Sequence, residues 1–156
     1  MYYFAYGSNM SVDRLKKRVP SAVVKGVGSI SGCVLKFNKV SKDGSGKGNI
    51  QHTGNQDDIV PGVVYAFDKA EKPKLDKAEG LGQGYDEKTV TVSTSKGKIQ
   101  AVTYYATKTD NTLKPYTWYK EHVIKGAKEN NLPEDYIAKL DQTDAIKDPN
   151  PKLHDS

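Results

Sequence analysis

Apolar side chains recur along the chain with two spacings, the two-residue period of strands and the three-to-four-residue period of helices. Residues 2–6 are aromatic or small and are followed at once by Gly7, which predicts a short strand. Val90 and Val92 alternate with hydroxyl side chains in residues 88–94, and turn residues lead on to residues 98–107, which predicts a hairpin. Further strands are expected within residues 22–27, 29–40 and 61–67.

Helical spacing appears in four other segments. Val12, Leu15 and Val19 lie three and four residues apart, and either Asn9 or Ser11 is expected to cap this short helix. A second helical segment covers residues 69–79, with a cap at Asp68, a regular part beginning near Pro73 and an end at Gly80. Two more helices are expected at residues 115–130 and from Pro133 onward, the last with Ile137 and Leu140 turned inward.

The remaining segments are polar. Residues 42–58 are rich in Gly, Asn, Asp and Ser and predict a long mobile loop, long enough to act as a lid. Residues 141–156 form a polar, extended tail in this interpretation, after a single domain at residues 1–140. Strands and helices follow one another without a regular βαβ rhythm. The pattern therefore predicts an α+β fold with a small, mixed, mostly antiparallel β-barrel and flanking helices.

Composition narrows the class of protein. The chain has 156 residues, of which 36% are hydrophobic and 28% are charged, as in a globular protein with its own core. No apolar run approaches the roughly 18 residues of a membrane span, and no basic or apolar leader follows Met1. Cys33 is the sole cysteine, which excludes an intrachain disulfide and fits a cytoplasmic location. No membrane partner is expected.

The net charge of +5 raises the question of a nucleic-acid partner. The lysines are scattered, however, and the densest basic block, residues 14–18, is more typical of a solvated helix face. We therefore expect no nucleic-acid binding. A milder consequence of the same charge is attraction of small anionic substrates.

Several familiar motifs fail on their spacing. GSGK at residues 44–47 lacks the first glycine and the Ser or Thr of a phosphate-binding loop. Ser8 lacks the flanking glycines of a nucleophile elbow. The three histidines are far apart and show no ligand spacing, so no metal site is expected. These histidines are His52, His122 and His154.

Three separated motifs together resemble the γ-glutamylcyclotransferase family, with its AIG2-like fold. They are YFAYGSN at residues 3–9, LDKAEG at residues 75–80, and Tyr119 followed by GAKENNLP at residues 126–133. YGSN alone is shared across several subgroups, whereas the third motif is similar to the animal-type branch of glutathione metabolism. The resemblance runs from the first residues to about Leu140 and leaves out residues 42–58 and the tail.

The resemblance implies an intramolecular reaction. The α-amine of a γ-glutamyl substrate attacks the substrate's own γ-carbonyl, closes a five-membered ring and releases 5-oxoproline and a free amino acid. The partner is a small-molecule γ-glutamyl substrate, and no metal or organic cofactor is implied. Members of the family occur as monomers and dimers, so the resemblance leaves open whether this chain forms a homodimer.

The family motif places the catalytic glutamate at Glu79. Its chemistry fits, because a protonated amine needs a general base before it can attack. A helix C-terminus and partial burial both raise the pKa of a carboxyl group. The alternative is a solvent-facing glutamate next to a glycine cap.

The opening motif supplies the other expected site residues. Gly7 lets a ligand approach the main chain closely, and the N–H groups around residues 6–8 are expected to bind the glutamyl carboxylate or the developing oxyanion. Tyr119 matches a substrate-contacting tyrosine, and its alternative role is that of a core aromatic. The substrate-binding residues implied by the resemblance are Tyr3, Phe4, Ala5, Tyr6, Gly7, Ser8 and Tyr119.

Two other functions stay open from the sequence. One is the same cyclisation acting on γ-glutamyl amines, including γ-glutamyl groups on a lysine side chain. The other is a non-catalytic binding module of the same fold, against which the retained Glu79 argues.

Overall fold

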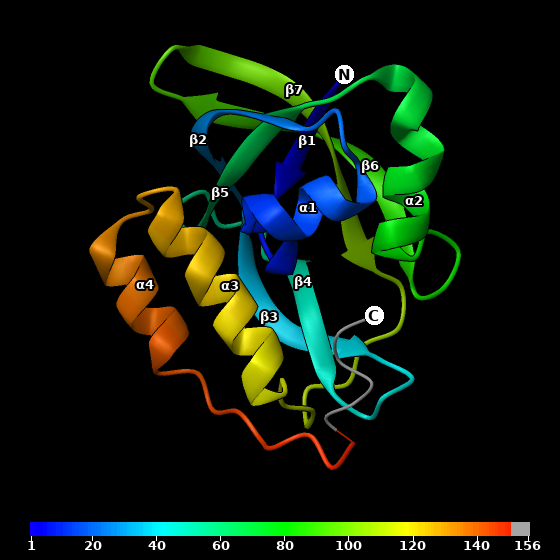
Figure 1. Cartoon of the computed structure of the whole chain (residues 1–156). Helices are drawn as coiled ribbons and strands as arrows, with labels where there is room; N and C mark the ends of the chain where they lie inside the picture. The colour runs from blue at the N-terminus through cyan, green and yellow to red at the C-terminus, as the bar shows by residue number, and fades with distance from the viewer. Residues whose placement is uncertain (151–156) are drawn as a thin grey trace.

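A computed structural model describes residues 1–150, which fold into a closed barrel, a separate two-stranded sheet and helices around them (Figure 1). The strands are β1 (Tyr2–Ala5), β2 (Val23–Ser31), β3 (Cys33–Val40), β4 (Gly46–His52), β5 (Ile59–Ala66), β6 (Tyr85–Thr94) and β7 (Gly97–Ala106). The α-helices are α1 (Val12–Arg18), α2 (Lys72–Glu79), α3 (Thr117–Glu129) and α4 (Glu134–Asp141), and the 3₁₀ turns are η1 (Ser8–Met10) and η2 (Lys69–Glu71).

The barrel has the strand order β1-β5-β2-β6-β7. Its neighbouring strands are antiparallel, except that β1 closes against β7 in parallel through the pair Tyr3 and Val102. The β6–β7 hairpin turns through residues 95–96, between the paired residues Thr94 and Gly97. The predicted α+β fold with a mixed, mostly antiparallel barrel is therefore confirmed.

The predicted loop at residues 42–58 is wrong over its middle part, because residues 46–52 form β4. Polar side chains that locally favour a turn are satisfied there by distant partners. Asn49 is buried, its Oδ1 accepts from the Ala106 N–H at 2.8 Å, and its Nδ2 donates to Asn38 at 3.2 Å. A Cβ on Gly46 would stand 2.0 Å from the Phe37 carbonyl oxygen, so glycine permits the close pairing with β3. Because residues 46–52 are a paired strand, the structure gives no support to the expectation that they act as a mobile lid.

The helices follow the sequence pattern with one change at the first cap. Asp68 accepts a hydrogen bond from the Ala70 N–H at 3.0 Å, and the regular helix α2 starts at Lys72, as the expected break near Pro73 requires. Ser11 occupies the N-cap position of α1, but its side chain makes no capping hydrogen bond. The Asn9 side chain does not cap the helix either, because it donates to a residue of α2.

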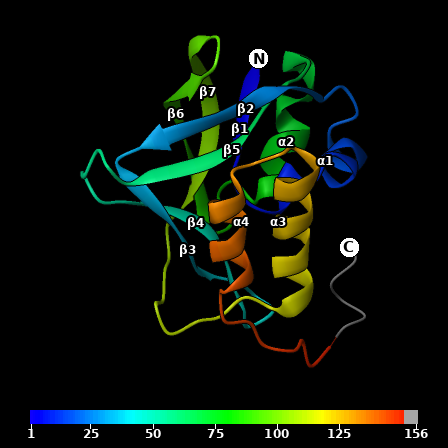
Figure 2. The ribbon, with the colours of Figure 1, turned by 90° about the vertical axis from the view of Figure 1, so that its left-hand side faces the viewer.

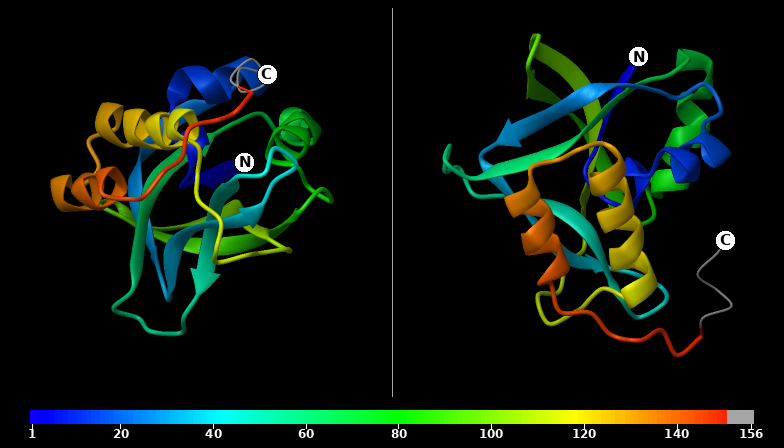
Figure 3. Two further views of the ribbon diagram at one scale, coloured as in Figure 1. Left: turned by 90° about the horizontal axis from the view of Figure 1, so that it is seen from below. Right: turned by 60° about the vertical axis from the view of Figure 1, so that its left-hand side comes forward.

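Helices α3 and α4 pack as a pair on one side of the molecule, and α2 lies on the other (Figures 2 and 3). The core between the helices and the barrel contains Val123 and Ala127 of α3 and Leu140 of α4. Leu140 is buried as expected, whereas Ile137 is only partly buried. Within residues 1–150, no helix has the length and apolar character needed to cross a membrane.

Residues 142–150 form neither a helix nor a strand and run along the start of α3. The Ile146 N–H donates to the Pro115 carbonyl at 3.0 Å, and the Trp118 indole donates to the Asp148 carboxylate at 2.9 Å. The expected extended tail is thus fixed to the domain over its described part. The rest of the predicted tail, residues 151–156, lies outside the described residues.

Candidate active site

Glu79 is the last residue of α2, and the way that the helix ends fixes its position. Gly80 follows in the left-handed region, with φ of 79°, as predicted for the end of this helix. The N–H groups of Gly80 and Leu81 both donate to the Asp76 carbonyl, at 3.0 and 2.9 Å. Leu75 is 1% exposed and anchors the inner face of the helix. The helix end therefore holds Glu79 against the barrel.

The Glu79 carboxylate receives two hydrogen bonds from the N-terminal segment. The Tyr3 hydroxyl and the Asn9 side-chain amide both donate to Oε1, the amide at 2.9 Å. The side chain lies inside the protein and keeps part of its surface open to a cavity. Burial raises the pKa of Glu79, and the hydrogen bonds from Tyr3 and Asn9, followed by the charges of Arg18 and Arg14, oppose that rise.

The turn after β1 lies next to this carboxylate, since Ser8 lines the same cavity. Its carbonyls are used internally, because the Met10 N–H donates to the Gly7 carbonyl at 3.1 Å and the Ser11 N–H donates to the Ser8 carbonyl at 3.2 Å. Within residues 1–150, the N–H groups of Gly7 and Ser8 have no hydrogen-bond acceptor in the protein. A Cβ on Gly7 would stand 3.3 Å from the Tyr119 hydroxyl, so a larger residue would crowd the turn.

Tyr119 reaches this turn from α3. Its hydroxyl accepts from the Gly48 N–H at 3.0 Å. Burial raises the pKa of Tyr119, and the hydrogen bond from Gly48 opposes that rise. The Tyr85 hydroxyl donates to the Gly48 carbonyl at 2.6 Å. The two tyrosines thus hold β4 against the site through one glycine.

A cavity of about 240 Å³ joins these groups. Its lining residues are Ser8, Asn9, Arg14, Arg18, Lys39, Ser41, Lys47, Lys77, Ala78, Glu79, Gly80, Tyr85 and Tyr119. Of the residues expected from the sequence, Ser8, Glu79 and Tyr119 line the cavity, and Tyr3 reaches it through its hydrogen bond to Glu79. Among the described residues, no three His, Cys, Asp or Glu side chains gather as a metal site requires.

Other residues of the opening motif are part of the core. Phe4 and Ala5 are fully buried, and the Phe4 carbonyl accepts from the Thr103 hydroxyl at 2.8 Å. Tyr6 donates its hydroxyl hydrogen bond to the Tyr104 carbonyl. A direct role of these three side chains in substrate binding stays a prediction.

The basic side chains of the cavity wall and Tyr85 were not found from the sequence. The interpretation of residues 14–18 as a solvated face is wrong for Arg14 and Arg18, which line the cavity, and holds for the exposed Lys16 and Lys17. The four-residue spacing that puts both arginines on one helix face was the available signal. No comparable signal pointed to Lys39 or Lys47. Lys47 lies in a segment that was expected to be a loop, and the pairing that sets Lys39 opposite it was therefore not predicted.

The chain is similar to known proteins in both sequence and structure. Residues 59–140 match the AIG2-like family. The chain is 38% identical to gamma-glutamylcyclotransferase of Bos taurus over 143 residues and 33% identical to that of Homo sapiens over 148 residues. In both cases the match covers 88% of this chain and 76% of the relative.

A solved structure titled gamma-glutamyl cyclotransferase shows the same fold. It superposes with a TM-score of 0.85 at 33% identity, and the match covers 93% of this chain and 88% of that one. The resemblance to the animal-type branch, first drawn from short motifs, thus extends over most of the chain. The chain belongs to the γ-glutamylcyclotransferase family, with its AIG2-like fold.

Proposed function

We propose that this protein is a γ-glutamylcyclotransferase that converts γ-glutamyl amino acids to 5-oxoproline and a free amino acid, with Glu79 as general acid and base. The observation that carries the proposal is the Glu79 carboxylate in a cavity that Ser8 also lines, next to a turn where the Gly7 and Ser8 N–H groups have no acceptor among the described residues. The names and the similarity of the relatives support the reaction class.

The first step is removal of a proton from the substrate. At neutral pH the α-amine is an ammonium group, and its nitrogen cannot attack until it is deprotonated. Burial raises the pKa of Glu79 above that of an exposed glutamate, which makes its carboxylate a stronger base. Tyr3 and Asn9 donate to one oxygen of the carboxylate, so the other oxygen is oriented to take the proton.

Ring closure then forms a bond between the amine nitrogen and the γ-carbonyl carbon. The carbonyl oxygen becomes negatively charged in the tetrahedral intermediate, and fixed N–H donors stabilise such an oxyanion without reorganising. The Gly7 and Ser8 N–H groups supply such donors. The Tyr119 hydroxyl accepts from Gly48 and keeps its own proton to donate to the glutamyl head.

Collapse of the intermediate breaks the original amide bond. The protonated Glu79 returns its proton to the departing nitrogen, and the regenerated carboxylate then takes the extra proton from the ring nitrogen. This second proton passes to the released amine, which leaves as the ammonium group of a free amino acid. Atoms balance without water or a co-reactant. Holding amine and carbonyl close together contributes several kcal/mol to such a reaction, up to about 7–11 in ideal cases. The cavity beside Glu79 suits that task.

We place this activity in the cytoplasm, among γ-glutamyl compounds of glutathione metabolism. The support is the single cysteine, Cys33, which is 5% exposed and has no partner cysteine in the chain.

The test is a panel of γ-glutamyl amino acids and γ-glutamyl amines, with 5-oxoproline measured by mass spectrometry. The unaltered protein is expected to release 5-oxoproline, and Glu79→Gln to lower kcat about 10²- to 10⁴-fold, the range of general acid–base catalysis. Glu121→Gln, which removes an exposed carboxylate from α3, is the matched control and should keep full activity. Undiminished turnover by Glu79→Gln would contradict the role of Glu79 as general acid and base. If the unaltered protein released 5-oxoproline from none of the compounds, the proposed cyclotransferase function would be contradicted.

A further inference from the structure

Lys39 and Lys47 lie directly opposite each other in the sheet formed by β3 and β4. Both side chains line the cavity that contains Glu79. Like charges paired directly across two strands destabilise a sheet. Such a pair at a cavity wall therefore costs stability unless a negative charge lies nearby.

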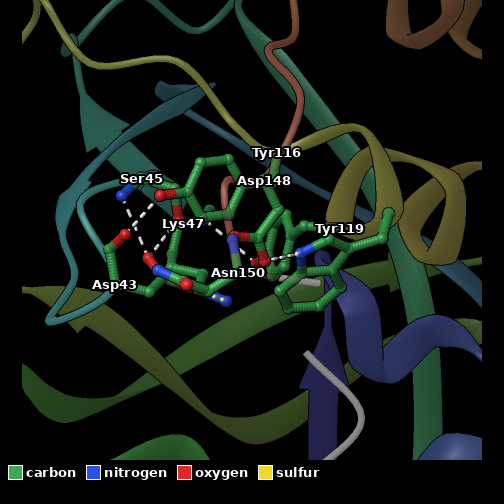
Figure 4. Close-up of polar contacts among 9 residues, drawn as sticks. Asp43, Ser45, Lys47, Tyr116, Tyr119, Asp148 and Asn150 are labelled. Atoms are coloured by element: carbon green, nitrogen blue, oxygen red, sulfur yellow. Dashed lines mark hydrogen bonds and ion pairs between the residues drawn. The ribbon is translucent and has the colours of Figure 1, made fainter. Parts of the chain in front are cut away.

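Lys47 has such a charge within the protein. Its ammonium nitrogen is 3.5 Å from the Asp43 carboxylate, which also accepts from Ser45, as Figure 4 shows. The same nitrogen lies 4.4 Å from the ring centre of Trp118 and 4.5 Å from that of Tyr119. An ion pair and two aromatic faces thus hold Lys47 in place and compensate its charge.

Lys39 forms no ion pair among the described residues, and the more distant charge of Asp43 opposes the lowering of its pKa by burial. Its ammonium nitrogen lies 4.9 Å from the ring centre of Tyr85, and no carboxylate within residues 1–150 approaches it within ion-pair distance. The chain makes room for it at Gly84, where a Cβ would stand 2.7 Å from Lys39 Cε and 3.0 Å from Nζ. Burial also lowers the pKa of Lys39. A partly desolvated cation without an ion-pair partner is suited to bind an anion.

The substrate of the proposed reaction has two carboxylates, one on the glutamyl group and one on the leaving amino acid. The glutamyl end must lie at Glu79 and the Gly7–Ser8 turn, because its amine and γ-carbonyl react there. Lys39 reaches the cavity from another wall, formed by β3 and covered by Tyr85. The charge left for Lys39 is therefore that of the leaving amino acid.

We propose that Lys39 binds the carboxylate of the leaving amino acid and thereby makes the enzyme select γ-glutamyl amino acids over γ-glutamyl amines. This assignment rests on the proposed function and adds to it the residue that determines the substrate class. The ring of Tyr85 and the space at Gly84 position the Lys39 side chain.

The test compares two substrates that differ only in this carboxylate, γ-glutamylalanine and γ-glutamylethylamide. Lys39→Met is expected to lower kcat/KM for γ-glutamylalanine about tenfold or more and to change kcat/KM for γ-glutamylethylamide less than about twofold, since one charged contact is removed from one substrate only. Lys39→Arg keeps the charge and should keep most of the preference. The matched control is Lys36→Met, which removes an exposed lysine from the same strand outside this cavity.

Equal losses on both substrates, or no loss on γ-glutamylalanine, would overturn the assignment while leaving the proposed function intact. If the unaltered protein formed 5-oxoproline from neither compound, the proposed function and this subsite would both be refuted. Thermal unfolding of each variant separates lost folding from lost recognition, and Lys39→Gln gives a second neutral variant if Lys39→Met does not fold.

Discussion

The Tyr3 hydroxyl donates a hydrogen bond to the carboxylate of Glu79, which lies 76 positions later in the chain. The contact joins the first strand of the barrel to the end of α2. Burial and this carboxylate raise the pKa of Tyr3 well above its ordinary value, so the hydroxyl stays a donor. The base of the proposed reaction is thus held by a residue of the core.

The pH dependence of turnover should report the pKa of Glu79. Because burial raises that pKa above the value of about 4.3 for an exposed glutamate, the acidic limb of kcat/KM should lie at a higher pH than an exposed glutamate would give. Activity should rise with pH through this limb as the carboxylate loses its proton. A profile of 5-oxoproline formation against pH measures it, and persistence of the same limb in the residual activity of Glu79→Gln would assign it to another group.

Folding stability should change with pH in the opposite sense. A carboxyl group whose pKa is raised in the folded state contributes stability below its unfolded pKa of about 4.3, and this contribution is lost as pH rises through the folded pKa. Glu79→Gln has no such proton to lose. The stability of this variant, measured as its free energy of unfolding minus that of the unaltered protein, should therefore be greater at pH 8 than at pH 4. Urea unfolding at both pH values measures the difference, and the opposite trend would show that Glu79 is not destabilised by burial.

Tyr3→Phe should move the acidic limb to still higher pH. The Tyr3 hydrogen bond lowers the pKa of Glu79, so its loss raises the pKa of the carboxyl group further. At neutral pH we expect a roughly three- to tenfold lower kcat/KM, the effect of one hydrogen bond to a charged group. The control is Tyr2→Phe, because Tyr2 is 38% exposed on the same strand. An unshifted limb with reduced activity would indicate that Tyr3 has only a structural role.

Two tyrosine-to-phenylalanine substitutions should differ in their effect on stability. Tyr119→Phe leaves the buried Gly48 N–H without its acceptor and should cost about 1–3 kcal/mol. The Tyr136 hydroxyl is buried and has no hydrogen-bond partner among the described residues, so Tyr136→Phe should be neutral or stabilising. Chemical denaturation of the two variants tests the contrast, and equal losses would count against it.

Gly126→Ala should impair activity from a position outside the cavity. A Cβ at Gly126 would stand 2.5 Å from the Met10 carbonyl carbon and from the Ser11 nitrogen, both of them main-chain atoms. The required shift moves η1, which carries Asn9, and should cost about 1–3 kcal/mol of stability. Lys128→Ala, an exposed change on the same helix, is the control. A variant as stable and active as the unaltered protein would show that η1 moves without cost.

The sequence by itself determined the elements whose signals are local. The caps at Asp68 and Gly80, the hairpin of β6 and β7 and the two C-terminal helices all follow from residue preferences and from spacing within one segment. The family could also be inferred, since YFAYGSN, LDKAEG and GAKENNLP are short contiguous motifs. Glu79 was placed at a helix end for the same reason.

Only the tertiary structure decided what these elements bring together. β4 forms from a segment with loop composition because Asn49 accepts from Ala106 and the Gly46 N–H donates to the Lys114 carbonyl, partners far away in the chain that no local pattern reports. Asn9 contacts Glu79 instead of capping α1 for the same reason. The wall that contains Lys39 exists only because β3 and β4 pair. Local propensity describes a segment by itself, whereas burial and hydrogen bonding of polar side chains depend on what packs against it.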